Sequence, residues 1–304
     1  MPNIIAIIWD FDKTLIDGYM EEPVFKKFGV DSKQFWAEVQ ALPDRYLHEQ
    51  NVRVNPDTIY LNHMINYTKL GIFKGLNNEM LREFGHELPF YSGVPEIFKV
   101  TKEVIETKPE YQEYDIRLEH YIVSTGLTEI IKGSPVMQYI NQVWGCEFIE
   151  AENEDGTREI SEVGYTIDNT TKTRALFEIN KGAGINGVTV NTFIPESERR
   201  VHFINMVYVA DGPSDIPAFS VVNRNGEATF AVYPRGDKRA LHQVEKMRKE
   251  KRVNMFAEAD YSENSLARMW LCEKIEEFAE RIRSQERAKI AQYTASGEVK
   301  HLTD

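Results

Sequence analysis

Four short stretches of the chain are continuously apolar and rich in β-branched or aromatic residues, and three of them stop abruptly at a polar residue. The stretches and the residues that follow them are 4–9 before Asp10, 121–123 before Ser124, 206–210 before Asp211, and 229–233 before Pro234. A strand that is buried on both faces of a parallel sheet has this pattern, because neither of its faces reaches water. We therefore predict four central strands.

Helical patterns separate these strands, and several begin at residues that favour helix N-termini. The predicted starts are Asp31 or Ser32, Asn55-Pro56, Asn77 or Asn78, Gly93-Val94-Pro95, and Asn169-Thr170-Thr171. Strands that alternate with helices predict an α/β fold with a parallel sheet.

The spacing of these elements predicts a helical domain inserted into the α/β domain. Residues 16–88 are almost wholly helical in pattern, so we assign 1–15 and 89–287 to the core and 288–304 to a polar C-terminal tail that frays. Within the core, 146–170 predicts short strands around an Asp155-Gly156 turn. Neither 146–170 nor 185–205 suggests a function. The apolar stripe of 262–287 predicts a helix docked on the core, with a homodimer contact through this helix or the cap as the alternative.

Composition narrows the class of protein. The 304 residues include 36 Lys and Arg against 48 Asp and Glu, a net charge of −12, which disfavours binding to nucleic acid or anionic membranes. Only Cys146 and Cys272 are present, too few for a disulfide framework. No apolar run reaches the roughly 18 residues of a membrane span, and the first strand lacks the basic flank of a signal peptide. We expect a cytoplasmic protein in which a phosphorylated substrate would need a local cation.

Pairs of aspartates follow two of the predicted strands. Asp10 and Asp12 follow the first, while Asp211 and Asp215 follow the third. Two carboxylates about 4 Å apart repel by about 4 kcal/mol at an effective dielectric constant near 20, so such a pair needs a metal ion, a proton or a lysine. A D-x-D pair alone also fits a solvated turn or a helix cap. The strand ends favour a ligand site, because open α/β sheets bind ligands there.

Two further residues fit the same site. Ser124 follows the second strand and offers a hydroxyl group, although a helix N-cap is the commoner role of such a serine. Lys172 lies in the first turn of a predicted helix, where the helix dipole disfavours a cation by roughly 0.3–1 kcal/mol. A nearby carboxylate cluster would offset that cost.

Taken in order, these residues resemble the motifs of the haloacid dehalogenase superfamily of phosphotransferases. Asp10-Phe11-Asp12-Lys13-Thr14 matches its D-x-D-x-T motif, and Ser124 and Lys172 match the second and third motifs. Residues 210–215 match G-D-G-x-x-D, with Ala210 in place of the first glycine. The resemblance implies a Rossmann-like parallel sheet with an inserted, C1-type helical cap, most similar to the phosphoserine-phosphatase-like branch.

The resemblance also implies a reaction. Asp10 would attack phosphorus and form an aspartyl-phosphate, and Asp12 would act as the general acid and then the general base. Mg²⁺ would be bound by Asp10, the backbone carbonyl of Asp12, and Asp211, with Asp215 supporting it directly or through water.

The remaining motif residues would bind the phosphoryl group. Ser124, Thr125 and Gly126 would contact its oxygens, together with backbone amides after Asp10, and Lys172 would balance the charge. Among the cap residues, we single out groups that could contact the leaving group, although each is also explained as a solvated residue: Tyr19, Glu21, Arg45, His48 and Arg53.

We therefore expect a Mg²⁺-dependent phosphatase acting on a small phosphorylated metabolite, which the sequence does not identify. A phosphomutase or other phosphotransferase of the same fold stays open, because only exclusion of water separates it from a phosphatase. A catalytically silent binding protein of this fold is a further alternative. A phosphoacceptor module of the receiver type is disfavoured by the length of the chain and by the large insertion.

Overall fold

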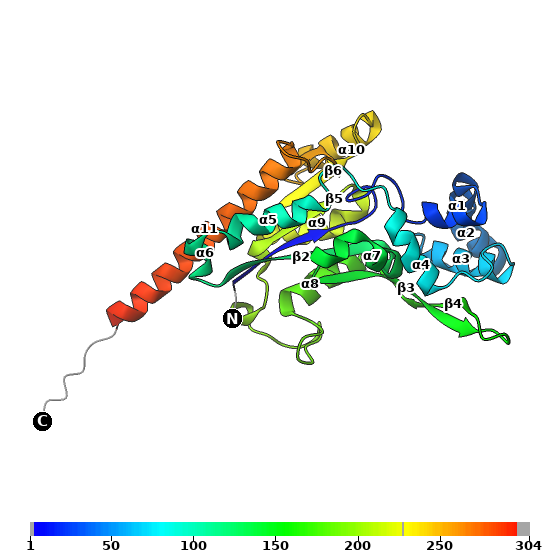
Figure 1. The fold of residues 1–304 in the computed structure, drawn as a ribbon, viewed down its shortest axis with the longest axis horizontal. Helices are drawn as coiled ribbons and strands as arrows, with labels where there is room; N and C mark the ends of the chain where they lie inside the picture. Colours follow the sequence, from blue (N-terminus) through cyan, green and yellow to red (C-terminus); the bar gives the residue numbers. More distant parts are fainter. Residues whose placement is uncertain (1–2, 227, 297–304) are drawn as a thin grey trace, which may run out of the picture.

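The computed structural model describes residues 3–226 and 228–296, which contain one seven-stranded sheet in the order β4-β3-β2-β1-β5-β6-β7 (Figure 1). Its strands are β1 (Asn3–Trp9), β2 (Ile116–Leu127), β3 (Gln142–Glu152), β4 (Arg158–Tyr165), β5 (Met206–Ala210), β6 (Thr229–Tyr233) and β7 (Met255–Glu258). All neighbouring strands are parallel except β3 and β4, which form an antiparallel hairpin. The predicted α/β fold with a parallel sheet is confirmed.

The four predicted strands all lie in the middle of this sheet. β1 is central, and its residues from Ile5 to Trp9 are fully buried, as expected for a strand covered on both faces. The second strand is much longer than the predicted 121–123, because β2 begins at Ile116 and continues to Leu127. The first half of β2 lacks a continuous apolar pattern because it contains the polar residues Glu119 and His120. Both are buried, and partners distant in sequence satisfy them.

Helices cover both faces of the sheet. The core helices are α5 (Glu96–Glu106), α6 (Pro109–Gln112), α7 (Thr128–Gly133), α8 (Thr171–Lys181), α9 (Ile216–Asn225), α10 (Lys238–Lys249) and α11 (Leu266–Ser296). Right-handed crossovers place α5 and α7 on one face, because β1, β2 and β3 step one way across the sheet. They place α8, α9 and α10 on the other, because the later strands step the opposite way. α11 packs on α5.

The first four helices after β1 lie at one end of the molecule in Figure 1, and α5 and α6 then return the chain to the sheet at β2. The four are α1 (Glu22–Phe28), α2 (Ser32–Gln50), α3 (Ile59–Lys69) and α4 (Asn78–Phe84). Asp31 and Asn77 cap α2 and α4 as predicted. α3 begins at Ile59, later than the predicted start at Asn55-Pro56, but Asn55 still accepts from the Asp57 N–H through its side chain (3.0 Å) and from the Ile59 N–H through its carbonyl (3.0 Å). The Asn55 side chain also donates to Asp168. The division of the chain into a core and a cap domain stays a prediction.

The predicted strands in 146–170 are confirmed as the β3–β4 hairpin, which packs against the inserted helices. The backbone N–H of Ile160 donates to the carbonyl of Leu76 (2.8 Å), and the Asn78 N–H donates to the Glu150 carboxylate (2.6 Å). This hairpin therefore connects the sheet to the helical insertion. Segment 185–205 is anchored to the core instead, since Arg200 forms an ion pair with Glu119 of β2 (2.5 Å).

The C-terminal helix differs from its prediction in length. Leu271, Ile275 and Phe278 of α11 are buried, which confirms that the apolar stripe docks on the core. The helix does not end at 287, however, but continues to Ser296, because residues 287–291 include good helix formers such as Arg287, Ala288 and Lys289. This contradicts the predicted tail as far as 296, and the rest of it, 297–304, lies outside the described residues.

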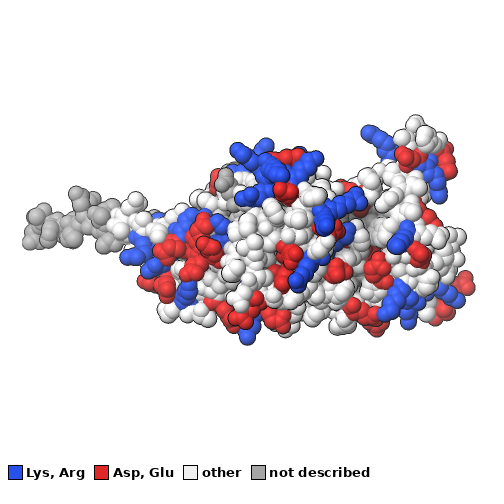
Figure 2. All heavy atoms as spheres, turned by 90° about the horizontal axis from the view of Figure 1, so that it is seen from above, with Lys and Arg blue, Asp and Glu red and all other residues white. Residues whose placement is uncertain are grey.

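The large net charge does not form a field of one sign on the face drawn in Figure 2, where acidic and basic side chains are interspersed. In the described part of the chain, no helix combines the length and the apolar character needed to cross a bilayer.

Candidate active site

The site forms where the strand order reverses. β1 lies between β2 and β5, with Trp9 beside Ile122 on one side and Val209 on the other. The residues after β1 and β5 therefore leave the sheet at the same edge, and the Asp10 N–H donates to the carbonyl of Val209 (2.9 Å). Such a reversal opens a crevice at the carboxyl ends of the strands.

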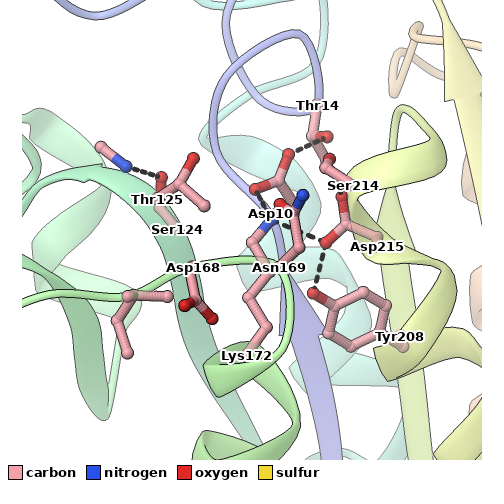
Figure 3. A network of polar contacts seen from close by, with 12 residues as sticks. Asp10, Thr14, Ser124, Thr125, Asp168, Asn169, Lys172, Tyr208, Ser214 and Asp215 are labelled. Carbon is pink, nitrogen blue, oxygen red and sulfur yellow. Dashed lines mark hydrogen bonds and ion pairs between the residues drawn. The ribbon is translucent and has the colours of Figure 1, made fainter. Parts of the chain in front are cut away.

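Asp10 is held at this edge by two donors (Figure 3). One carboxylate oxygen accepts from Lys172 Nζ (2.7 Å), and the other accepts from Thr14 Oγ1 (3.0 Å). The side chain is only 7% exposed. Burial raises the pKa of Asp10 to about 6, opposed by Lys172 and increased further by Asp215.

Asp215 is more fully enclosed than Asp10. One of its carboxylate oxygens accepts from both Lys172 Nζ (2.7 Å) and the Tyr208 hydroxyl (2.6 Å), and the other accepts from Ser214 Oγ (2.8 Å). Figure 3 shows these groups converging from β5, its following turn and α8. Asp215 therefore fixes Lys172 in place, and Lys172 in turn orients Asp10.

Lys172 lies in the first turn of α8 and is 1% exposed. Burial would lower its pKa, but the carboxylates of Asp10 and Asp215 outweigh this effect and raise the pKa above its ordinary value. The compensating carboxylates expected for a lysine at a helix N-terminus are thus present. The Asp168 carboxylate accepts from the N–H groups of Thr170 and Thr171 and satisfies the donors at the start of the helix.

Asp211 completes a cluster that fits a divalent cation. Oxygen atoms of Asp10, Asp211 and Asp215 lie within 4.8 Å of one another. Burial, followed by repulsion from Asp10 and Asp215, raises the pKa of Asp211 to about 7. One ammonium group against three carboxylates leaves an excess of negative charge, and carboxylate oxygens are the ligands that Mg²⁺ prefers. Asp12 does not belong to this group of side chains, so only its backbone carbonyl could join it, as the resemblance implies.

The Asp12 side chain is hydrogen-bonded to the start of the insertion instead. Its Oδ1 accepts from the backbone N–H of Met20 (3.0 Å). Burial raises the pKa of Asp12 well above its ordinary value, and repulsion from Glu21 and Asp10 adds to the increase. Burial likewise raises the pKa of Glu21 to about 7.

Two adjoining cavities open at this site. The first, the strand-end cavity, has a volume of about 240 Å³ and is lined by Asp10, Asp12, Lys13, Tyr19, Asp57, Thr125, Asn169, Lys172, Asp211 and Ser214. The second, the cap cavity, has a volume of about 160 Å³ and is lined by Asp12, Tyr19, Glu21, Trp36, Asp57, Tyr60, Thr125 and Gly126. Asp12 lines both, so it stands at their junction. A larger hollow of about 480 Å³, near Arg248 and Lys251, contains none of the predicted site residues.

The structure thus brings most of the predicted site residues together. Asp10, Asp12, Asp211 and Lys172 line the strand-end cavity, and Asp215 lies behind them. The three predicted phosphate-binding residues of β2 do not all reach the cavities. Thr125 and Gly126 line cavities, whereas Ser124 is buried and its hydroxyl accepts from the Gly126 N–H (3.0 Å). Among the cap candidates, Tyr19 and Glu21 line the cap cavity, but Arg45, His48 and Arg53 are exposed and line neither cavity.

Sequence reasoning missed several supporting residues. The sequence pattern places Tyr208 in a buried strand and does not indicate that its hydroxyl donates to Asp215. Thr14 belongs to the D-x-D-x-T motif, and the structure shows that its hydroxyl donates to Asp10. Asn169 was interpreted as a helix-cap residue, whereas it lines the strand-end cavity and its N–H donates to Asp57 of the insertion (3.4 Å). A polar atom inside an apolar strand is a usable signal, since buried polar groups need partners.

Comparison with known proteins gives one sequence relative and several structural ones. No family model matches the chain. An uncharacterized protein from Borreliella burgdorferi is 37% identical over 288 residues, which cover 90% of this chain and 97% of that protein.

Two solved structures are similar in fold. A HAD family hydrolase from Salmonella enterica serovar Typhi has a TM-score of 0.50 at 14% identity, covering 84% of this chain and 67% of that one. A substrate-bound phosphoserine phosphatase complex has a TM-score of 0.51 at 15% identity, covering 84% of this chain and 93% of that one. At such identities the likeness is one of fold. The chain therefore shares the fold of these two proteins, and its sequence shows that it belongs to one family with the Borreliella burgdorferi protein.

Proposed function

We propose that this protein is a metal-dependent phosphatase that hydrolyses a small phosphomonoester through a phosphorylated Asp10. The observation that carries the proposal is the placement of Asp10. Its carboxylate is oriented by Lys172 and Thr14 at the floor of a cavity whose other lining residues include Asp12 and Asp211. A carboxylate nucleophile requires this kind of fixed orientation toward the phosphorus atom.

Asp12 is positioned for proton transfer to and from the leaving oxygen. It stands where the strand-end cavity meets the cap cavity, so a substrate with its phosphoryl group beside Asp10 would place the bridging ester oxygen near Asp12. The Met20 N–H fixes one carboxylate oxygen of Asp12 and leaves the carboxyl group beside both cavities. Asp12 would protonate the departing alcohol and then take a proton from the attacking water.

Asp10, Asp211 and Asp215, with the backbone carbonyl of Asp12, would hold Mg²⁺. When bound, such a cation supplies positive charge that neutralises phosphoryl oxygens as the phosphorus–oxygen bonds change. Lys172 supplies a second, permanent positive charge at the same place, and Thr125 lines the wall where phosphoryl oxygens would lie. These charges would attract an anionic substrate to a chain that is itself strongly acidic.

The test is phosphate release from p-nitrophenyl phosphate with Mg²⁺ and with a chelator. We expect wild-type activity that requires Mg²⁺ and a loss of at least about 1,000-fold in Asp10→Asn, since removing a nucleophile abolishes the covalent route. Asp44→Asn, the same change at an exposed position on α2, is the matched control and should keep full activity. Equal rates in Asp10→Asn and wild type would refute the assignment. Consumption of substrate without phosphate release would instead indicate transfer to another acceptor, as in a phosphomutase.

A further inference from the structure

The cap cavity has a lining that the phosphatase reaction itself does not require. Carboxyl groups of Glu21 and Asp57 contribute to its wall beside Asp12, and no Lys, Arg or His lines it among the described residues. The strand-end cavity, by contrast, contains Lys13 and Lys172. The two adjoining cavities therefore differ in their ionisable groups: two lysines stand among the aspartates of the strand-end cavity, whereas the ionisable groups described in the cap cavity are carboxyl groups and tyrosine hydroxyls, with no basic side chain.

Two residues that line the cap cavity each carry a buried polar atom with no hydrogen-bond partner among the described residues. Glu21 is 2% exposed, and its Oε2 has no hydrogen-bond partner within the described chain. The indole N–H of Trp36 is buried and likewise unpaired. Leaving a buried polar group without a partner is unfavourable, and more so for a charged group. A ligand that offers a cation or a hydrogen-bond donor would satisfy the Glu21 carboxyl group.

The other walls of the cap cavity are aromatic. The rings of Tyr19 and Trp36 have centroids 5.5 Å apart, and those of Trp36 and Tyr60 have centroids 5.7 Å apart. Trp36 thus connects three rings that all line the same cavity. Aromatic faces attract cations through their quadrupole, and the attraction grows when water is excluded. Rings combined with a buried carboxylate form a suitable environment for a positively charged nitrogen.

We propose that the cap cavity binds a cationic nitrogen of the leaving group, so that the substrate is a phosphomonoester of a small amino alcohol. This inference rests on the proposed phosphatase function. Asp12 lines both cavities, so the ester oxygen would lie at their junction, the phosphoryl group toward Lys172, and the nitrogen toward Glu21. At about 160 Å³ the cap cavity is smaller than the roughly 300–1,000 Å³ of pockets for drug-sized ligands, which restricts the leaving group to a few heavy atoms.

The experiment compares pairs of phosphomonoesters that have nearly the same shape but differ in charge. One pair is 2-aminoethyl phosphate and propyl phosphate. The other is 2-(trimethylammonio)ethyl phosphate and 3,3-dimethylbutyl phosphate, in which carbon replaces the charged nitrogen. We expect kcat/KM for the cationic member to exceed that for the neutral member at least tenfold in one or both pairs. No preference for the cation in either pair would overturn the inference.

A substitution identifies the group responsible. Glu21→Gln keeps the size of the side chain and removes its charge, so the ratio of kcat/KM between cationic and neutral members should fall at least fivefold. The ratio is insensitive to the fraction of folded protein, because both substrates meet the same preparation. Glu22→Gln, the same change at the next and exposed position, should leave the ratio unchanged. An unchanged ratio in Glu21→Gln would refute the role of Glu21.

Failure of this inference is distinguishable from failure of the proposed function. If wild type releases no phosphate from any ester, including p-nitrophenyl phosphate, the phosphatase proposal fails. If it hydrolyses p-nitrophenyl phosphate and the neutral esters as efficiently as the cationic ones, the phosphatase proposal stands and the cationic subsite is refuted.

Discussion

Protonation of His120 should control how the stability of the fold depends on pH. His120 lies in β2, fully buried beneath Trp9, the residue that precedes Asp10. Its Nδ1 is 3.1 Å from Trp9 Nε1, and its Nε2 is 3.2 Å from both the Phe98 carbonyl and Thr101 Oγ1. Because the indole N–H can only donate, Nδ1 must be the acceptor and Nε2 must carry the proton. The arrangement requires a neutral imidazole.

The magnitude follows from the difference in pKa. Burial, with a contribution from the charge of Lys102, lowers the pKa of His120 from 6.5 to about 3. Between these two pKa values, the unfolded chain therefore binds a proton more readily than the folded protein. The contribution of neutral His120 to the free energy of unfolding is fully present above pH 6.5 and is lost as pH falls toward 3. The loss amounts to about 1.4 kcal/mol per pH unit, or about 2 kcal/mol between pH 7 and pH 5.

The assay is urea unfolding at pH 7 and pH 5 for wild type and His120→Gln. Glutamine can still accept from Trp9 and donate toward Phe98, but it does not titrate. We expect the variant to be less stable at pH 7, because it loses ring contacts with Phe98 (centroids 5.0 Å apart), and to lose about 2 kcal/mol less than wild type on going to pH 5. His242→Gln, at an exposed position of α10, should retain the wild-type pH dependence.

The result that would refute this reasoning is an equal loss of stability in wild type and His120→Gln between the two pH values. All other titratable groups are common to both proteins, so equal losses would mean that His120 does not resist protonation in the folded state.

Two further substitutions, each with a matched control, test the ion pairs of Lys172 and the close packing at Gly93. Lys172→Met leaves Asp10 and Asp215 without their cation and should lower the free energy of unfolding by about 3–5 kcal/mol, whereas Lys99→Met, at an exposed ion pair, should cost less than about 1 kcal/mol. Equal effects would contradict the buried ion-pair network. Gly93 has φ +82°, and an added Cβ would lie 2.1 Å from the backbone of Tyr261, so Gly93→Ala should cost more than about 3 kcal/mol. Gly71, with φ +75° and open space, is the control and should cost only about 1 kcal/mol, as measured by thermal unfolding.

The negative net charge takes on a different meaning once the site is known. Asp10, Asp211 and Asp215 contribute three acidic side chains to one strand-end cluster, where they surround Lys172 or lie beside it. Electrostatics at this site depend on a few buried groups, because charges inside the protein are poorly screened, whereas exposed charges are screened within about 10 Å at 0.1 M salt. The net charge therefore affects which partners bind the surface, but it does not determine the local charge in the strand-end cavity.

The identity of the central strands and of the acidic residues that follow them was readable from the sequence. A strand buried on both faces must be continuously apolar, so 4–9 and 206–210 stood out, and the first polar residue after each had to lie at the edge of the sheet. Lys172 could be singled out as well, because a cation in the first turn of a helix conflicts with the helix dipole. These signals are local, and they require only the residues of one element.

The tertiary structure alone decided which distant groups complete the site. The hydroxyl of Tyr208 and the side chain of Lys172 meet at Asp215, and His120 meets Trp9 across 111 positions of sequence. The cap cavity is formed in the same way, because Glu21, Trp36 and Thr125 come from separate elements that lie side by side only after the insertion packs on the sheet. Hydrophobic patterning specifies which face of an element is buried, but the partner of each buried polar atom depends on how the elements pack, and a single sequence carries no local record of that packing.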